Sequence, residues 1–171
     1  LQTINEPTAA AIAYGVKHRS DTRERVLVFD LGGGTFDVTL LEVGPHGIKV
    51  VTSDGDDELG GKDWDDALVE HVSTLFEEQH GEDPQEDLEV RAELMMEAES
   101  VKKALSSRGT ARMSVALGGE RERYDIDRAL FEGLTSGLME RTVTLCESVL
   151  AAQGLAPEDV DGVLLVGGST R

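Results

Sequence analysis

The sequence predicts an α/β fold in which the two ends of the chain form one layer and an α+β subdomain is inserted between them. Strand-like runs gather toward both ends, and the long helix-like segments lie in the middle. Gly162–Val166 is wholly apolar, as is typical of a central strand that is buried on both faces. Two such layers around a core are the usual architecture of a domain. The expected parts are a split base, residues 1–59 with 137–171, and an insertion, residues 60–136.

The chain opens with a predicted short helix. Asn5 can cap it, Pro7 falls in its first turn and Gly15 can end it. A polar loop follows over residues 17–25, and three strands are expected next. These strands are predicted at residues 26–30, 35–43 and 48–53.

The middle of the chain predicts two helices, a hairpin and a third helix. The first helix is expected over residues 63–79 and the second over residues 85–107. Strands at 111–117 and 121–126 follow, joined by two glycines, and Asp127 then caps a helix that runs to about residue 153 with a possible break near Gly137. The three predicted inner faces are Trp64, Leu68, Val72 and Leu75; Leu94, Ala98, Val101 and Leu105; and Phe131, Leu134, Leu138, Leu145 and Val149.

Composition excludes several classes of protein. The net charge of −18 is unfavourable for binding nucleic acid or an anionic membrane surface, which attract lysine and arginine. No apolar run approaches the ~20 residues of a membrane-spanning helix, and no signal peptide is evident. Cys146 is the single cysteine, which suits a reducing, cytoplasmic setting. Because the chain starts without methionine inside a helix-like segment, we expect it to be a fragment of a longer protein.

The most informative segment is the glycine-rich turn from Asp30 to Asp37. It lies between two predicted strands, so it forms the tip of a hairpin with a carboxylate on each side of three glycines, Gly32, Gly33 and Gly34. Glycine permits positive φ and has no Cβ, so bare backbone amides can form an anion nest for phosphate. The flanking carboxylates and Thr35 suit a magnesium ion beside that phosphate. The alternative is a tight hairpin with solvated acids.

Two further groups are weaker candidates. Gly167, Gly168 and Ser169 follow the apolar strand at 162–166, where ligands of α/β sheets bind, although a simple strand-to-helix turn explains them equally well. On the second helix, four polar residues share one face at the rim of the core stripe. They are Glu99, Lys102, Lys103 and Ser106. They can contact a ribose or a base, but periodicity alone favours a solvated face with a Glu–Lys pair.

Together these segments resemble the ATPase domain of the seventy-kilodalton heat-shock chaperones of the DnaK type. The matching segments occur in the family's order and spacing over nearly the whole chain. They are residues 4–11, residues 30–37, residues 59–61, Lys102 with residues 105–107, and residues 166–171. The resemblance implies an actin-like, ribonuclease H-like ATPase fold, of which this chain is the second lobe.

The resemblance also implies roles by position, with ATP or ADP and Mg²⁺ as cofactors. Catalysis would involve Asp30, Thr35, Asp37 and Glu6, of which the three acids would hold Mg²⁺ mainly through water. The residues implied to contact the nucleotide are Gly32, Gly33, Gly34, Thr35, Gly61, Glu99, Lys102, Lys103, Ser106, Gly167, Gly168, Ser169 and Arg171. Among them, the loop glycines would hold the phosphates, and Lys103 and Arg171 would flank the adenine.

The implied parent is an ATP-hydrolysing, stress-response chaperone. Its partners would be the first lobe and the peptide-binding domain of the same parent chain, unfolded peptides, a J-domain co-chaperone and a nucleotide-exchange factor, without nucleic acid or membrane. We expect the isolated segment to be inactive as an ATPase, because phosphoryl transfer needs groups from the other lobe. The alternatives are a small-molecule kinase and a non-enzymatic, nucleotide-binding structural protein on the same scaffold.

The chain departs from the family pattern at two places. The loop at residues 55–61 is more acidic than in the family, and Glu58 stands where the family has histidine. Lys103 occupies a position where many members have arginine. Because a lysine ammonium stacks less well on a flat base than a guanidinium, we expect weaker adenine binding.

Overall fold

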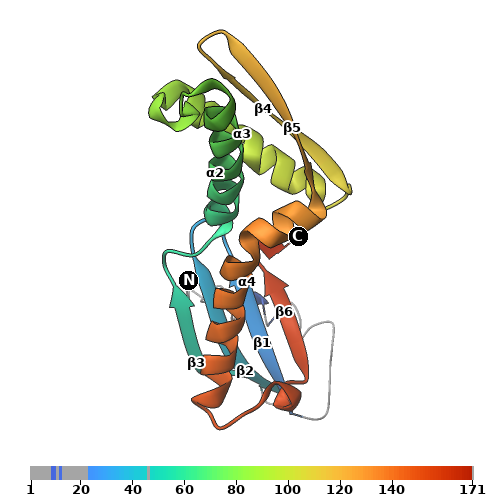
Figure 1. Ribbon diagram of the computed structural model, residues 1–171. Coiled ribbons are helices and arrows are strands. Elements are labelled where there is room, and N and C mark those ends of the chain that lie inside the picture. Colours follow the sequence, from blue (N-terminus) through green and yellow to red (C-terminus); the bar gives the residue numbers. More distant parts are fainter. Residues whose placement is uncertain (1–8, 11, 13–22, 46, 171) are drawn as a thin grey trace, which may run out of the picture. The chain divides into compact units, whose positions relative to one another are not determined.

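The computed structural model describes residues 9–10, 12, 23–45 and 47–170, and the chain forms two compact units (Figure 1). The first unit comprises residues 1–61 and 140–171, and the second comprises residues 62–139. The predicted N-terminal helix and the loop after it fall almost wholly outside the described residues, of which 9, 10 and 12 are helical. The mixture of sheet and helix confirms the predicted α/β class.

The first unit is built on a four-stranded sheet with the order β3-β2-β1-β6. The strands β1 (Glu24–Leu31), β2 (Phe36–Gly44) and β3 (Gly47–Asp56) form the predicted antiparallel meander. β3 continues three residues beyond its predicted end, into the acidic segment that was expected to be a loop. β6 (Gly162–Val166) pairs with β1 in parallel, so both strands end at the same edge of the sheet.

The centre of this sheet is buried on both faces. In β2, consecutive residues Leu40 and Leu41 are both fully buried, as are Phe36 and Val38. A strand that buries neighbouring side chains, which point to opposite faces, must be covered on both sides. The hydroxyls of Thr39 and Ser53, which are 2.8 Å apart, satisfy each other across β2 and β3.

β6 is not the central, doubly buried strand that its apolar sequence predicts. Among the described residues it pairs only with β1, and it forms one edge of the sheet. Leu164 and Val166 pack against the core, whereas Val163 and Leu165 are 57% and 59% exposed. The prediction was wrong because an uninterrupted apolar run shows that both faces can be buried, but not that the described chain covers them.

The second unit packs helices against a two-stranded ribbon. Its elements are α2 (Gly61–His80), a 3₁₀ turn η1 (Pro84–Glu86), α3 (Leu88–Leu105), β4 (Thr110–Leu117) and β5 (Glu120–Asp127). The ribbon is antiparallel, with Leu117 opposite Glu120 at the two-glycine turn. The core stripe predicted for α3 is confirmed, because all four of its residues are buried.

Two helix predictions in this unit need correction. Residues 85–107 do not form one helix, because Asp83 caps η1 and Asp87 caps α3. The Asp87 carboxylate accepts hydrogen bonds from the backbone N–H groups of Glu89 and Val90 at 2.9 and 3.1 Å. On α2 the buried face is rotated from the predicted one, and Trp64 and Leu75 lie beside it. The residues of α2 that are buried after Gly61 are Asp65, Leu68, Val69, Val72, Ser73 and Phe76.

The helix α4 (Arg128–Ala151) is continuous, without the predicted break at Gly137. Its first half belongs to the second unit and its last turns to the first. The Asp127 carboxylate accepts from the Leu130 N–H at 2.7 Å, as expected for the cap. Near the middle of the helix, Arg141 donates to Asp56 at the end of β3. No helix among the described residues is long and apolar enough to span a membrane.

Candidate functional site

The glycine-rich turn is the tip of the β1–β2 hairpin, as predicted. Asp30 lies directly opposite Asp37 in the strand register, so the two carboxylates share a face. The turn closes with a hydrogen bond from the Gly32 N–H to the Thr35 carbonyl at 2.9 Å. Beneath it, the rings of Phe29 and Phe36 pack with centroids 4.6 Å apart. The hydrogen bond and the ring contact hold the turn in place, and its residues 33–35 are exposed.

Three glycine segments that are far apart in the sequence meet at the Gly32 carbonyl. This oxygen accepts a hydrogen bond from the Gly61 N–H at 2.9 Å. It accepts a second one from the Ser169 hydroxyl at 3.0 Å. The segments around residues 32–34, 60–61 and 167–170 therefore form one cradle around the hairpin tip, which we call the glycine cradle. The three glycine segments are evident in the sequence, but their shared contact is not.

Close backbone packing explains why two of these positions are glycine. A Cβ on Gly60 would lie 2.4 Å from the Gly34 backbone, and a Cβ on Gly167 would lie 2.1 Å from the Leu31 carbonyl oxygen. Gly167 also has φ near +90°, which side chains rarely adopt. Any other residue at these two places would push the cradle apart.

Of the two properties that the sequence suggested for the hairpin glycines, positive φ and a backbone without a Cβ, the structure uses only the second. None of Gly32, Gly33 and Gly34 has positive φ, so conformational freedom does not require them. A Cβ on Gly33 or Gly34 would meet nothing within 4 Å. The exposed side of the turn is therefore bare backbone with open space in front of it, and a ligand can approach it closely.

The two aspartates lie against glycines on either side of the turn. A Cβ on Gly167 would come within 2.7 Å of the Asp30 carboxylate, and one on Gly55 would come within 2.8 Å of the Asp37 carboxylate. Among the described residues, no group of three or more acidic, histidine or cysteine side chains is placed to hold a metal. Two carboxylates on one face fit Mg²⁺, because this ion keeps several waters and takes few protein ligands.

The predicted group on α3 contains two ion pairs of different character. Lys103 Nζ lies 2.7 Å from Glu99 Oε1, and both side chains are more than half exposed. The hydrogen bond from Lys103 lowers the pKa of Glu99 below its ordinary value. Lys102 Nζ lies 2.7 Å from Asp65 Oδ2 on α2, and this pair is largely buried. Ser106 is the exposed residue at the C-terminal cap of α3.

Not every predicted site residue lies in the described part of the chain. Glu6 and Arg171 lie outside it. The cradle residues belong to the first unit, whereas Glu99, Lys102, Lys103 and Ser106 belong to the second. The structure thus brings together the predicted residues within each group.

Sequence reasoning missed Asp65 as the partner of Lys102. The two are 37 residues apart, so no local spacing could pair them. One indication was available: Asp65 precedes Leu68 and Val72 by three and seven residues, so an acid occupies a position on the apolar stripe. The packing of Gly55 and Gly60 on the hairpin was also missed, because close approach of backbones leaves no pattern in composition.

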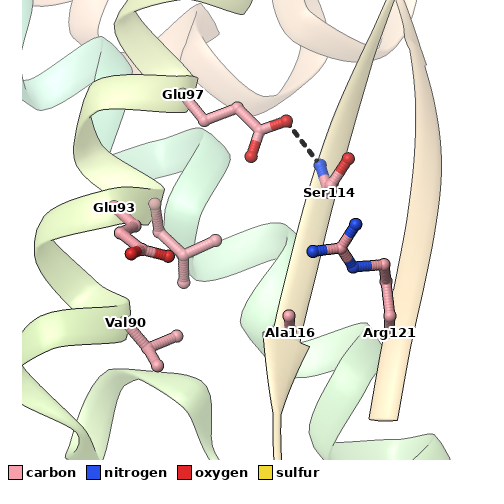
Figure 2. A pocket seen from close by; sticks show the side chains of 7 residues that line it. Val90, Glu93, Glu97, Ser114, Ala116 and Arg121 are labelled. Carbon is pink, nitrogen blue, oxygen red and sulfur yellow. Dashed lines mark hydrogen bonds between the residues drawn. The ribbon is translucent and has the colours of Figure 1, made fainter. Parts of the chain in front are cut away.

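A separate pocket of about 270 Å³ lies between α3 and the β4–β5 ribbon (Figure 2). Its lining includes Val90 and Ala116, with Glu93 on one wall and Arg121 on the other. Glu97 accepts the Ser114 N–H at 2.8 Å and so covers part of the open edge of β4. None of the predicted nucleotide-contacting residues that the structure describes lines this pocket. Glu97 and Glu99 are two positions apart in the sequence, about 200° around the helix, so these two side chains point to opposite sides of α3.

Comparison with known proteins identifies the family. Residues 1–171 match the family model described as Hsp70 protein. The chain is 44% identical over 174 residues to the chaperone protein DnaK of Halobacterium salinarum, which covers 98% of this chain and 27% of that protein. It is 42% identical over 177 residues to the chaperone protein DnaK of Thermosipho melanesiensis, covering 100% of this chain and 30% of that protein. The chain spans less than a third of these relatives, and it belongs to the Hsp70 family, with the actin-like ATPase fold of that family.

Proposed function

We propose that this chain is the nucleotide-binding lobe of an ATP-hydrolysing molecular chaperone. The family binds adenine nucleotides, and the full-length protein would couple hydrolysis to the binding and release of unfolded peptides. In this proposal the first unit is the base subdomain and the second is the inserted outer subdomain. Nucleotide would bind between this lobe and a first lobe elsewhere in the same protein.

The observation that carries the proposal is the glycine cradle beside two aspartates. Three glycine segments meet at one carbonyl, Gly32, and leave the backbone of Gly33 and Gly34 bare. Backbone amides without a Cβ in front of them suit the close approach of phosphate oxygens. The paired carboxylates of Asp30 and Asp37 supply the negative charge that a phosphate-bound cation needs.

In this proposal the amides of the cradle and the Thr35 hydroxyl hold the β- and γ-phosphates. Asp30 and Asp37, together with Glu6, hold the waters around Mg²⁺ and orient the attacking water. When bound, Mg²⁺ supplies charge neutralisation at the phosphates. The acidic groups would thus act by positioning water, because phosphoryl transfer depends mainly on alignment and charge stabilisation.

The nucleoside would be held by the residues of α3 and by the C-terminal glycine turn. Glu99, Lys102 and Ser106 would contact the ribose and base. Lys103 and Arg171 would flank the adenine, with Gly61 and the turn at 167–169 close by. Lys103 is exposed and, among the described residues, is paired to Glu99 on its own helix, so its stem can cover a ring.

Partners follow from the proposed cycle. Closure and opening of the two lobes would signal to a peptide-binding domain, a hinge-type transition. A J-domain co-chaperone would stimulate hydrolysis, and a nucleotide-exchange factor would act on the outer subdomain. We place this protein in the cytoplasm, in keeping with its single cysteine.

The experiment is a measurement of Mg-ATP hydrolysis by the full-length protein with and without an unfolded peptide. We expect slow turnover that rises with peptide and is lost in Asp37→Asn. Asp57→Asn, in the exposed acidic loop, is the matched control and should retain turnover. An ATP hydrolysis rate that does not change when peptide is added would favour a kinase of the same fold. Absence of hydrolysis would favour a structural nucleotide-binding protein.

The isolated chain provides a second test. Because it holds one lobe only, residues 1–171 should not hydrolyse ATP at a useful rate. Metal-dependent turnover by the purified segment that disappears in Asp37→Asn would overturn the two-lobe proposal while leaving the phosphate site standing.

A further inference from the structure

Asp65 is an acidic residue in an apolar setting. It lies on the buried face of α2, on the stripe with Leu68 and Val72, and is only 6% exposed. Burial raises the pKa of its carboxyl, although the hydrogen bond from Lys102 acts in the opposite direction. Burying a charged carboxylate there costs free energy unless another interaction compensates for it.

Lys102 is the hydrogen-bond partner of this carboxylate. Its Nζ lies 2.7 Å from Asp65 Oδ2, and the lysine side chain is only 18% exposed. The other oxygen, Oδ1, is buried and has no hydrogen-bond partner within the described chain. The carboxylate therefore directs its one hydrogen bond at Lys102. A buried pair that leaves one oxygen unsatisfied is poorly explained by stability, because desolvation offsets most of the attraction.

The neighbouring lysine gives the contrast. Lys103 is the next residue on α3, and its partner Glu99 is four residues earlier on the same helix. Both of those side chains are more than half exposed, so the pair is screened by solvent and contributes little to stability. Lys102 instead bridges two helices, α3 and α2. Of the two lysines on the proposed nucleotide face, Lys102 is held by a buried partner on another helix, and Lys103 is held by an exposed partner on its own helix.

We propose that Asp65 is a positioning residue that holds the Lys102 ammonium in place for the nucleotide; this rests on the proposed function. A lysine side chain has four rotatable bonds, and ordering them when the ligand binds costs affinity. An anchor in the apolar layer between α2 and α3 removes that cost beforehand. A hydrogen bond from a residue that does not itself touch the ligand can hold a ligand-contacting side chain within a fraction of an ångström of its productive position.

The test is a double-mutant cycle on ADP affinity, measured by calorimetry on the full-length protein with Mg²⁺. The variants are Asp65→Asn, Lys102→Met and the double variant. We expect each single substitution to weaken ADP binding about tenfold, the effect of one hydrogen bond to a charged group. The double variant should bind no more weakly than Lys102→Met, because Asp65 acts only through that lysine.

The matched control is Asp66→Asn. Asp66 is the next residue on α2 and pairs with Lys62 on its own helix, in an exposed position. Its substitution should leave ADP affinity unchanged. A second variant, Asp65→Glu, keeps the charge but moves the carboxylate by one methylene. It should also weaken binding, since the position of the ammonium is what matters, and it serves if Asp65→Asn fails to fold.

Each outcome has one meaning. If Asp65→Asn binds ADP as tightly as the unmodified protein, Asp65 does not position Lys102. If the effects of Asp65→Asn and Lys102→Met multiply in the double variant, Asp65 acts by another route and the inference fails. If the unmodified protein does not bind ADP at all, the proposed function itself fails.

Discussion

Ser169 and Gly32 are 137 residues apart in the sequence, and the Ser169 hydroxyl donates a 3.0 Å hydrogen bond to the Gly32 carbonyl. This contact joins the turn after β6 to the tip of the β1–β2 hairpin. The same carbonyl accepts the Gly61 N–H at 2.9 Å, at the start of α2. One backbone oxygen thus links three segments of the proposed phosphate site, and the shape of the site depends on it.

Loss of the Ser169 hydroxyl should loosen the cradle moderately. We expect Ser169→Ala to lower the free energy of unfolding by about 1 kcal/mol, the typical net value of one hydrogen bond, because the Gly61 N–H still satisfies the Gly32 carbonyl. Urea denaturation measures this. Ser136→Ala is the control, since that hydroxyl bonds a carbonyl of its own exposed helix and should change stability little. Equal effects of the two substitutions would contradict the linking role of Ser169.

A methyl group at Gly60 should separate two parts of the cradle. Its Cβ would lie 2.4 Å from the Gly34 backbone, which cannot move aside as a flexible side chain would. We expect Gly60→Ala to destabilise the protein by roughly 1–3 kcal/mol, the range for overpacking. The control Gly133→Ala lies in α4 with open space around the new methyl and should stabilise by up to about 1 kcal/mol. If Gly60→Ala were as stable as the unmodified protein, the close packing of these backbones would be wrong.

An arginine at position 103 should improve adenine binding. Lys103 is exposed near the C-terminal end of α3, where a planar guanidinium would stack on a base better than a compact ammonium does. We expect Lys103→Arg to raise ADP affinity about two- to fivefold, the range of an exposed cation–π contact. Calorimetric titration of the full-length protein checks this. Lys49→Arg, on exposed β3, should have no effect. Unchanged ADP affinity in Lys103→Arg would remove Lys103 from the adenine site.

Local patterns predicted most of the elements. Strand-like apolar runs and turn residues marked the β1–β2–β3 meander, and the 3.6-residue period of Leu94 and Ala98 marked the core face of α3. The triple glycine between Asp30 and Asp37 predicted a hairpin tip with paired acids. In each case the determining interactions lie within a few residues, so the sequence displays them directly.

Features that depend on distant contacts were not predictable in the same way. The apolar sequence of β6 predicts a central strand. Its place at the edge of the described sheet depends instead on which segments pair with it. The Asp65–Lys102 pair and the double acceptor at Gly32 join residues brought together only by folding. The boundary between η1 and α3 was also missed, because both Asp83 and Asp87 can cap a helix. In the structure Asp83 caps η1 and Asp87 caps α3.

The central claim is that bare backbone at the hairpin tip binds nucleotide phosphate, and Gly33→Ala tests it most directly. A methyl group at Gly33 meets nothing within 4 Å, and the backbone there does not have positive φ, so the fold should be unaffected. It would occupy the space in which a phosphate must approach. By calorimetry on the full-length protein with Mg²⁺, we expect Gly33→Ala to weaken ADP binding at least tenfold, about one hydrogen bond to a charged group. Its melting temperature should match that of the unmodified protein, and Gly133→Ala should bind ADP normally. Undiminished ADP affinity in a folded Gly33→Ala protein would contradict the claim.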